Sequence, residues 1–88
     1  MTEREIVTMV NDVFEEYFEI ERERLLPEMN IFEDLELDSL DIVDLVVTMQ
    51  KKFNVSIRDD ERIRSVRTLW DIYQFILALK SEGVTPAA

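Results

Sequence analysis

Apolar residues recur at spacings of three and four along the first twenty residues of the chain, and acidic residues fill the positions between them. This period is that of an amphipathic helix with one buried face. Thr2 and Glu5 have the spacing of a capping box, in which a hydroxyl and a carboxylate satisfy backbone amides that lack a partner inside the helix. The pattern therefore predicts a helix over residues 2–20 that begins at Thr2.

The helical period stops over residues 21–37, where a proline and scattered apolar residues predict a long ordered loop pinned to the core. A second period begins at Asp38, whose carboxylate can cap the first turn, and continues to Phe53. Acidic residues stand near the start of this predicted helix, and Lys51 and Lys52 stand near its end, as the helix dipole favours. The second helix is therefore expected to be acidic first and basic last.

The C-terminal part of the chain predicts a short connection, one or two helical turns over residues 59–65, and a last helix that Thr68 caps and Gly83 stops. Three main helices, one short helix and a long first loop indicate an all-α four-helix bundle around one core. We expect a single domain over residues 1–82 and a short flexible tail over residues 83–88.

The net charge and the composition of the chain exclude several classes of partner and function. It carries 20 acidic and 10 basic residues, and this surplus repels nucleic acid and favours proteins with basic surfaces as partners. It contains no Cys and no His, so we expect neither a metal site nor an enzyme. Because it has no apolar run of about 20 residues and its start is acidic, we expect a cytoplasmic protein that does not insert into membranes. We also expect a monomer.

The segment Asp38-Ser39-Leu40 is the most informative part of the sequence. Asp-Ser-Leu alone is an ordinary way to begin a helix, but here it follows a long acidic loop, lies near the middle of a short chain and precedes an acidic, apolar helix. In this setting it resembles the modification site of acyl carrier proteins. By this resemblance, a phosphopantetheinyl transferase attaches 4'-phosphopantetheine from coenzyme A to Ser39. The chain then presents acyl thioesters to synthases or ligases in fatty-acid, lipid or polyketide-type biosynthesis.

The resemblance also assigns roles to the residues around Ser39. Between Leu25 and Asp44 the chain has seven acidic residues and no basic one, and in the family such a region docks against basic grooves on enzymes. The implied recognition residues are Asp38, Leu40, Asp41, Asp44 and Val47. An acyl chain held between helices would be lined by Ile31, Val46, Met49, Ile57, Ile72 and Tyr73. The bulky residues Trp70, Tyr73 and Phe75 fit equally well as side chains that fill this space, so both interpretations stay open.

The sequence departs from the family at two places. Fatty-acid carriers commonly have Gly two residues before Asp-Ser-Leu, where this chain has Glu36. Seven of the ten basic residues lie between Lys51 and Lys80, although the second helix of the family usually stays acidic. These bases either neutralise the chain's own acids or mark a specialised carrier with a dedicated synthase or ligase.

Three other functions compete with the acyl carrier. A peptidyl or aryl carrier of a nonribosomal pathway usually has Gly-Gly before the modified Ser, whereas this chain has Leu37-Asp38. An unmodified acidic adaptor that only binds a partner fits the same helix. A calcium loop is disfavoured, because Ser39 and Leu45 stand where such a loop needs Gly and Glu.

Overall fold

The computed structural model describes residues 2–57 and 61–82, and within these ranges it contains helices and no strand. The all-α prediction is confirmed. The short fourth helix is present as a 3₁₀ helix, and a second 3₁₀ turn lies in the first loop. The elements are α1 (Glu3–Phe18), η1 (Arg22–Arg24), α2 (Ser39–Phe53), η2 (Glu61–Ser65) and α3 (Leu69–Ser81).

Helix α1 begins as its sequence predicts. The Thr2 hydroxyl accepts a hydrogen bond from the Glu5 amide at 3.2 Å, and the Glu5 carboxylate accepts one from the Thr2 amide at 3.0 Å. The backbone hydrogen bond from Thr2 is the main reason that the pKa of Glu5 is lowered. The helix ends at Phe18, because Glu19 turns into the left-handed region with a φ of 54°. It thus ends two residues earlier than predicted.

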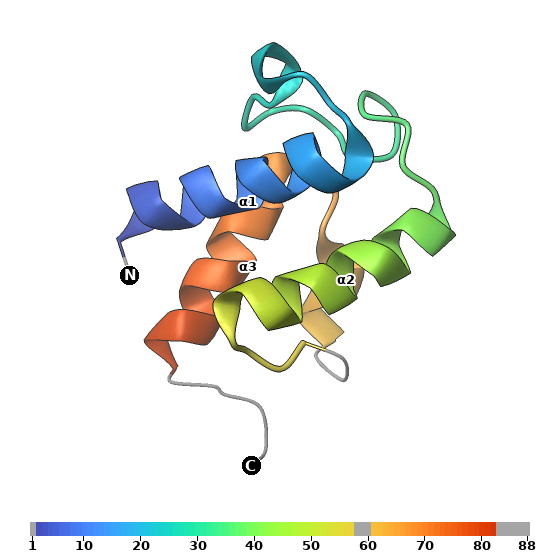
Figure 1. Cartoon of the computed structure of the whole chain (residues 1–88). Helices are drawn as coiled ribbons and strands as arrows, with labels where there is room; N and C mark the ends of the chain where they lie inside the picture. Colours follow the sequence, from blue (N-terminus) through green and yellow to red (C-terminus); the bar gives the residue numbers. More distant parts are fainter. Residues whose placement is uncertain (1, 58–60, 83–88) are drawn as a thin grey trace.

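The long first loop is ordered and tied to the start of α3. Figure 1 shows it arching from the end of α1 to the start of α2. Asn30 forms an isolated antiparallel bridge with Thr68, and the Ile31 amide donates to the Arg67 carbonyl at 2.8 Å. The loop also buries apolar side chains in the core, as the sequence predicts: Leu25, Ile31, Leu35 and Leu37. This packing fixes the point at which α2 begins.

Helix α1 packs against both α2 and α3, and η2 packs against α3. One buried polar pair joins α1 to α3, where the Tyr73 hydroxyl donates to Oδ1 of Asn11 at 2.6 Å. Burial raises the pKa of Tyr73 and outweighs the opposite effect of this hydrogen bond. The paired groups satisfy each other inside an otherwise apolar core, which is the usual condition for burying polar atoms.

The end of the predicted domain is only partly described. Helix α3 ends at Ser81 with Glu82 as its cap, whereas the predicted stop at Gly83 and the predicted tail over residues 83–88 lie outside the described residues. Residues 59 and 60 of the predicted short-helix region also lie outside them. Among the helices described, none has the length and apolar composition needed to cross a membrane.

Candidate functional site at the start of α2

Ser39 is the first residue of α2 and is exposed to solvent. The Asp38 carboxylate accepts hydrogen bonds from the Leu40 and Asp41 amides, both at 3.0 Å. In return, the Asp41 carboxylate accepts one from the Asp38 amide at 3.1 Å. The neighbouring carboxylates thus form the cap, and in the described part of the chain the Ser39 hydroxyl has no hydrogen-bond partner. An accessible hydroxyl at a helix start is suited to carry an anionic group, since the dipole there is positive.

The turn that leads into this cap is strained at Glu36. This residue has a φ of 60°, in the left-handed region. A residue with a side chain is disfavoured there by roughly 1–2 kcal/mol, whereas Gly enters the region freely. The conformation explains why Gly suits this position, and it shows that the chain makes the same kind of turn with Glu36 at an energetic cost.

An apolar stripe follows Ser39 along the exposed side of α2. Leu40 is 75% exposed, Val43 60% and Val47 42%. Their spacing of three and four residues places them on one helix face. The structure thus brings Leu40 and Val47 together with Val43, which sequence reasoning missed although the same period pointed to it.

The predicted recognition acids have different surroundings. Asp44 is an exposed residue on α2 beside the stripe. Asp38 and Asp41 hold each other's backbone amides in the cap, so part of their role is structural. Asp38 and Asp41 therefore also shape the start of α2.

A small cavity lies in the core beneath α2. Its volume is about 30 Å³, close to the space of a single water molecule. Five of the six residues predicted to line an acyl pocket surround it: Ile31, Val46, Met49, Ile57 and Ile72. Tyr73 is not among its lining residues and instead bonds to Asn11. Phe75 lines the cavity, whereas Trp70 is 49% exposed at the surface.

A larger groove of about 480 Å³ opens beside Ser39, between α2 and η2. Ser39 and Gln50 both line it, and the step of eleven residues from one to the other corresponds to about 16 Å of helix. Five side chains line both the groove and the inner cavity: Phe32, Ile42, Val46, Ile63 and Val66. These shared side chains form a layer between the groove and the inner cavity.

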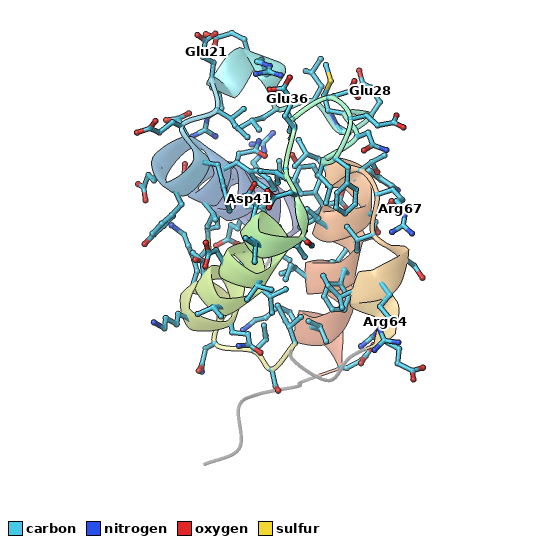
Figure 2. All side chains as sticks on the ribbon, turned by 90° about the vertical axis from the view of Figure 1, so that its right-hand side faces the viewer. Glu21, Glu28, Glu36, Asp41, Arg64 and Arg67 are labelled. Atoms are coloured by element: carbon cyan, nitrogen blue, oxygen red, sulfur yellow. The ribbon has the colours of Figure 1, made fainter. Side chains whose placement is uncertain are left out.

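The basic residues between Lys51 and Lys80 make different contacts within the chain. Arg62 forms an ion pair with Glu82 at 2.7 Å and lies over the Phe75 ring, so it joins η2 to α3. Arg64 and Arg67 line the groove instead, and Figure 2 shows them away from Asp41, on the side of η2 and α3. Arg58, which belongs to the same basic region, lies outside the described residues. Sequence reasoning named the region but missed its contact with the groove.

No group of acidic residues in the described ranges is arranged to hold a metal ion. Asp34, Glu36 and Asp38, which alternate like the first ligands of a calcium loop, have other surroundings. The Asp34 carboxylate accepts a hydrogen bond from the Asn30 amide at 2.8 Å, and Asp38 caps α2. These contacts account for two of the three carboxylates without an ion.

Comparisons with known proteins agree with this geometry. A sequence profile described as a phosphopantetheine attachment site matches residues 8–76. The chain is 39% identical to acyl carrier protein 2 of Ralstonia nicotianae over 79 residues, which cover 90% of this chain and 96% of that protein. It is 32% identical to the meromycolate extension acyl carrier protein of Mycolicibacterium smegmatis, with coverage of 99% and 87%. The structure of an acyl carrier protein from Enterococcus faecalis matches with a TM-score of 0.73 at 25% identity, over 90% of this chain and 99% of that one.

Proposed function

This chain belongs to the acyl carrier protein family, and from that premise we propose that Ser39 is the residue to which its phosphopantetheine arm is attached. The family carries acyl groups as thioesters on this arm. The exposed hydroxyl of Ser39 supports the assignment, because it stands at the start of α2, unused by the cap and open to the groove.

The attachment chemistry needs an accessible alcohol and an external base. The Ser39 oxygen attacks the pyrophosphate of coenzyme A, an oxygen–phosphorus bond forms, and 3',5'-adenosine bisphosphate leaves. The hydroxyl proton passes to a base of the phosphopantetheinyl transferase, since this chain has no His or Cys. We therefore propose that the chain carries substrates and catalyses no reaction itself. We further propose that it acts in the cytoplasm and that its residues 1–82 form one domain.

The exposed side of α2 is the proposed docking surface. Leu40, Val43 and Val47 supply an apolar centre, and Asp44 supplies charge beside it. Apolar anchors ringed by charge suit a partner with a basic groove, because the charges guide the approach and the buried side chains supply most of the affinity. We propose that the transferase and the acyl-transferring synthases or ligases bind here.

Cargo enters the core only after the molecule opens. A cavity of about 30 Å³ cannot contain an acyl chain, so the side chains that it shares with the groove must move apart. Met49 lines the cavity, and its flexible side chain suits repacking around chains of different length. A relative named for meromycolate extension supports an acyl cargo over an aminoacyl one.

Modification of Ser39 is tested by mass. The apo protein is incubated with coenzyme A and a broad-specificity phosphopantetheinyl transferase, and we expect the intact mass to rise by one phosphopantetheinyl group. Ser39→Ala should abolish the rise, whereas Ser56→Ala, which alters another exposed serine, should leave it unchanged. No adduct on the wild type with several transferases would favour an unmodified adaptor.

The specialised role is tested separately. Basic residues near the end of α2 should weaken docking to enzymes that bind wholly acidic carriers. We expect Lys51→Glu with Lys52→Glu to improve acyl transfer by a housekeeping fatty-acid synthase set. Arg62 is left intact, because it joins η2 to α3 through Glu82. Full activity of the wild type, with no gain in the double variant, would remove the case for a dedicated partner.

A further inference from the structure

The groove beside Ser39 has an apolar floor and a basic edge. In the described part of the chain, Arg64 and Arg67 are the only charged residues that line it. The opposite bank is α2, whose first turns carry Asp38, Asp41 and Asp44. Ser39 thus stands between acidic residues on its own helix and two arginines across the groove.

The guanidinium group of Arg67 is held in place by its surroundings. One of its terminal nitrogens donates to the carbonyls of Arg64 and Val66 at 2.7 and 2.8 Å, and the group lies 5.9 Å from the centre of the Phe32 ring. It forms no ion pair with a carboxylate of residues 2–57 or 61–82. Asp71 interacts electrostatically with Arg67, but its carboxylate accepts a hydrogen bond from the Arg67 backbone amide rather than from the guanidinium group. Arg67 therefore keeps donors available in a fixed position.

Phe32 lines the groove together with Arg67 and Ser39. It lines both the groove and the cavity, and it is the ring against which Arg67 lies. It also belongs to the loop that leads to the cap of α2. Through its contact with Phe32, Arg67 lies against the first loop, in the same groove that Ser39 lines.

A phosphodiester on Ser39 changes the electrostatics of this region. It adds a negative charge at the start of α2, whose first turns carry Asp38, Asp41 and Asp44. Repulsion from these acids disfavours the modified state near α2 unless a cation lies close by. Within the described residues, the groove offers such cations only at Arg64 and Arg67.

We propose that the attached arm lies back in this groove, with Arg67 binding its phosphodiester and Arg64 donating to the amide carbonyls further along. This rests on the proposed attachment at Ser39. The groove follows α2 for about 16 Å, which gives an extended arm room to lie along the apolar floor. A partner with a basic surface would compete for the phosphodiester and release the arm.

The experiment compares the apo and modified full-length protein. We expect the side-chain Nε–H resonance of Arg67 to shift on modification, and the phosphorus-31 resonance of the modified wild type to relax faster than that of modified Arg67→Gln. Docking should also protect the thiol from a bulky maleimide. Arg67→Gln should speed the thiol reaction roughly twofold to fivefold, the size expected for one partly exposed charge pair.

Three variants separate binding of the arm from damage to η2. Arg67→Lys keeps a cation and should retain part of the protection. Arg64→Gln leaves the Arg67 side chain in place and should have a smaller effect. Arg4→Gln removes an exposed charge on α1, away from the groove, and should change nothing. Raising the salt from about 0.05 to 0.5 M should remove the difference between wild type and Arg67→Gln.

The intact mass shows whether Ser39 carries the arm, so failure of the attachment is seen independently and would overturn both proposals. If the arm is attached but the Arg67 resonance does not move, the docked arm is wrong. The same holds if Arg67→Gln and Arg4→Gln change the thiol reaction equally. A shift that is lost in Arg67→Gln and partly kept in Arg67→Lys supports the proposal.

Discussion

The first turn of α2 and the first turn of α3 are closed by the same reciprocal cap. At α2 the Asp38 and Asp41 side chains each accept the other residue's amide, at 3.0 and 3.1 Å. At α3 the Thr68 hydroxyl accepts the Asp71 amide at 3.2 Å, and the Asp71 carboxylate accepts the Thr68 amide at 3.1 Å. Both helices therefore begin with their backbone amides satisfied from within their own first turn.

The two turns differ in what covers them. At α3 the Leu69 and Trp70 amides donate to carbonyls of the first loop, and Leu69 is fully buried. At α2 the corresponding first residue, Ser39, is exposed, and Leu40 is 75% exposed. The same local motif thus stabilises the fold at α3, where the first loop packs on it, and presents an exposed hydroxyl at α2, where no described part of the chain covers it.

Replacing the leucines of the two turns should give the largest difference in stability. Leu69→Ala leaves a cavity in the core and should lower the free energy of unfolding by about 2–5 kcal/mol. Leu40→Ala removes an exposed side chain and should stay within about 0.5 kcal/mol of wild type. Urea unfolding followed by circular dichroism measures both. Similar losses in the two variants would show that the turn of α2 is covered as well.

Leu40→Ala should instead affect binding. An apolar anchor at the centre of an interface contributes about 1–2 kcal/mol, so kcat/KM of the phosphopantetheinyl transferase for this protein should fall about 5- to 30-fold. Val7→Ala is the control, since Val7 lies on α1 away from the start of α2. An unchanged kcat/KM in Leu40→Ala would move the docking surface away from this stripe.

Removing the caps should cost similar amounts at both helices. Thr68→Ala and Asp38→Ala each leave amides unsatisfied and should lower the free energy of unfolding by about 1 kcal/mol. Only Asp38→Ala should also slow modification of Ser39, because it disturbs the turn that presents this residue. Both variants are measured by urea unfolding and by the rate of the mass increase. Equal modification rates would mean that the cap of α2 is dispensable for presentation.

The caps could be predicted because they are local. Thr2, Asp38 and Thr68 each begin a helix as expected, since a capping side chain and its amides lie within three residues of each other. Leu40 and Val47 were selected by the family resemblance, and their spacing along α2 places them on one face with Val43. The end of α1 was predicted less accurately, because Glu19 ends the helix in the left-handed region and nothing in the local sequence indicates this turn.

The groove could not be predicted from local patterns. Its walls come from Phe32 in the first loop, from α2 and from η2, and their meeting depends on long-range packing. For the same reason, the sequence could not show that Arg62 pairs with Glu82, twenty residues away, whereas Arg64 and Arg67 line the groove. Tyr73 shows a related limit: helical period places it in the core, but only the fold directs its hydroxyl to Asn11.

The strained turn before α2 should allow a stabilising substitution. Glu36 holds a φ of 60°, and Gly avoids the clash of a side chain in this region although it loses more entropy on folding. We expect Glu36→Gly to raise the free energy of unfolding by about 0.5–1 kcal/mol. Glu36→Ala is the matched control and should give no such gain. A loss of stability in Glu36→Gly would show that the glutamate side chain supports the turn.

The smallest expected effect is the pH dependence of the α3 cap. Burial raises the pKa of Asp71, but hydrogen bonds from the Arg67 and Thr68 amides and the Thr68 hydroxyl outweigh it, and the pKa is lowered overall. A lowered pKa in the folded state stabilises the fold above the unfolded pKa of about 3.9. This stabilisation is lost as the pH falls through the folded pKa. Asp71→Asn should therefore be less stable than wild type by about 0.5 kcal/mol at pH 7.

The difference between wild type and Asp71→Asn should shrink as the pH falls below about 3.9, where the carboxylate becomes protonated in the unfolded chain and then in the folded one. Urea unfolding at pH 7 and at about pH 2.5 measures this change. Modification of Ser39 at pH 7 should be unaffected, because Asp71 serves the covered turn of α3 rather than the exposed turn of α2. A stability difference that stays constant with pH would mean that the Asp71 carboxylate holds α3 by its shape alone, and slower modification would show that the two turns are coupled.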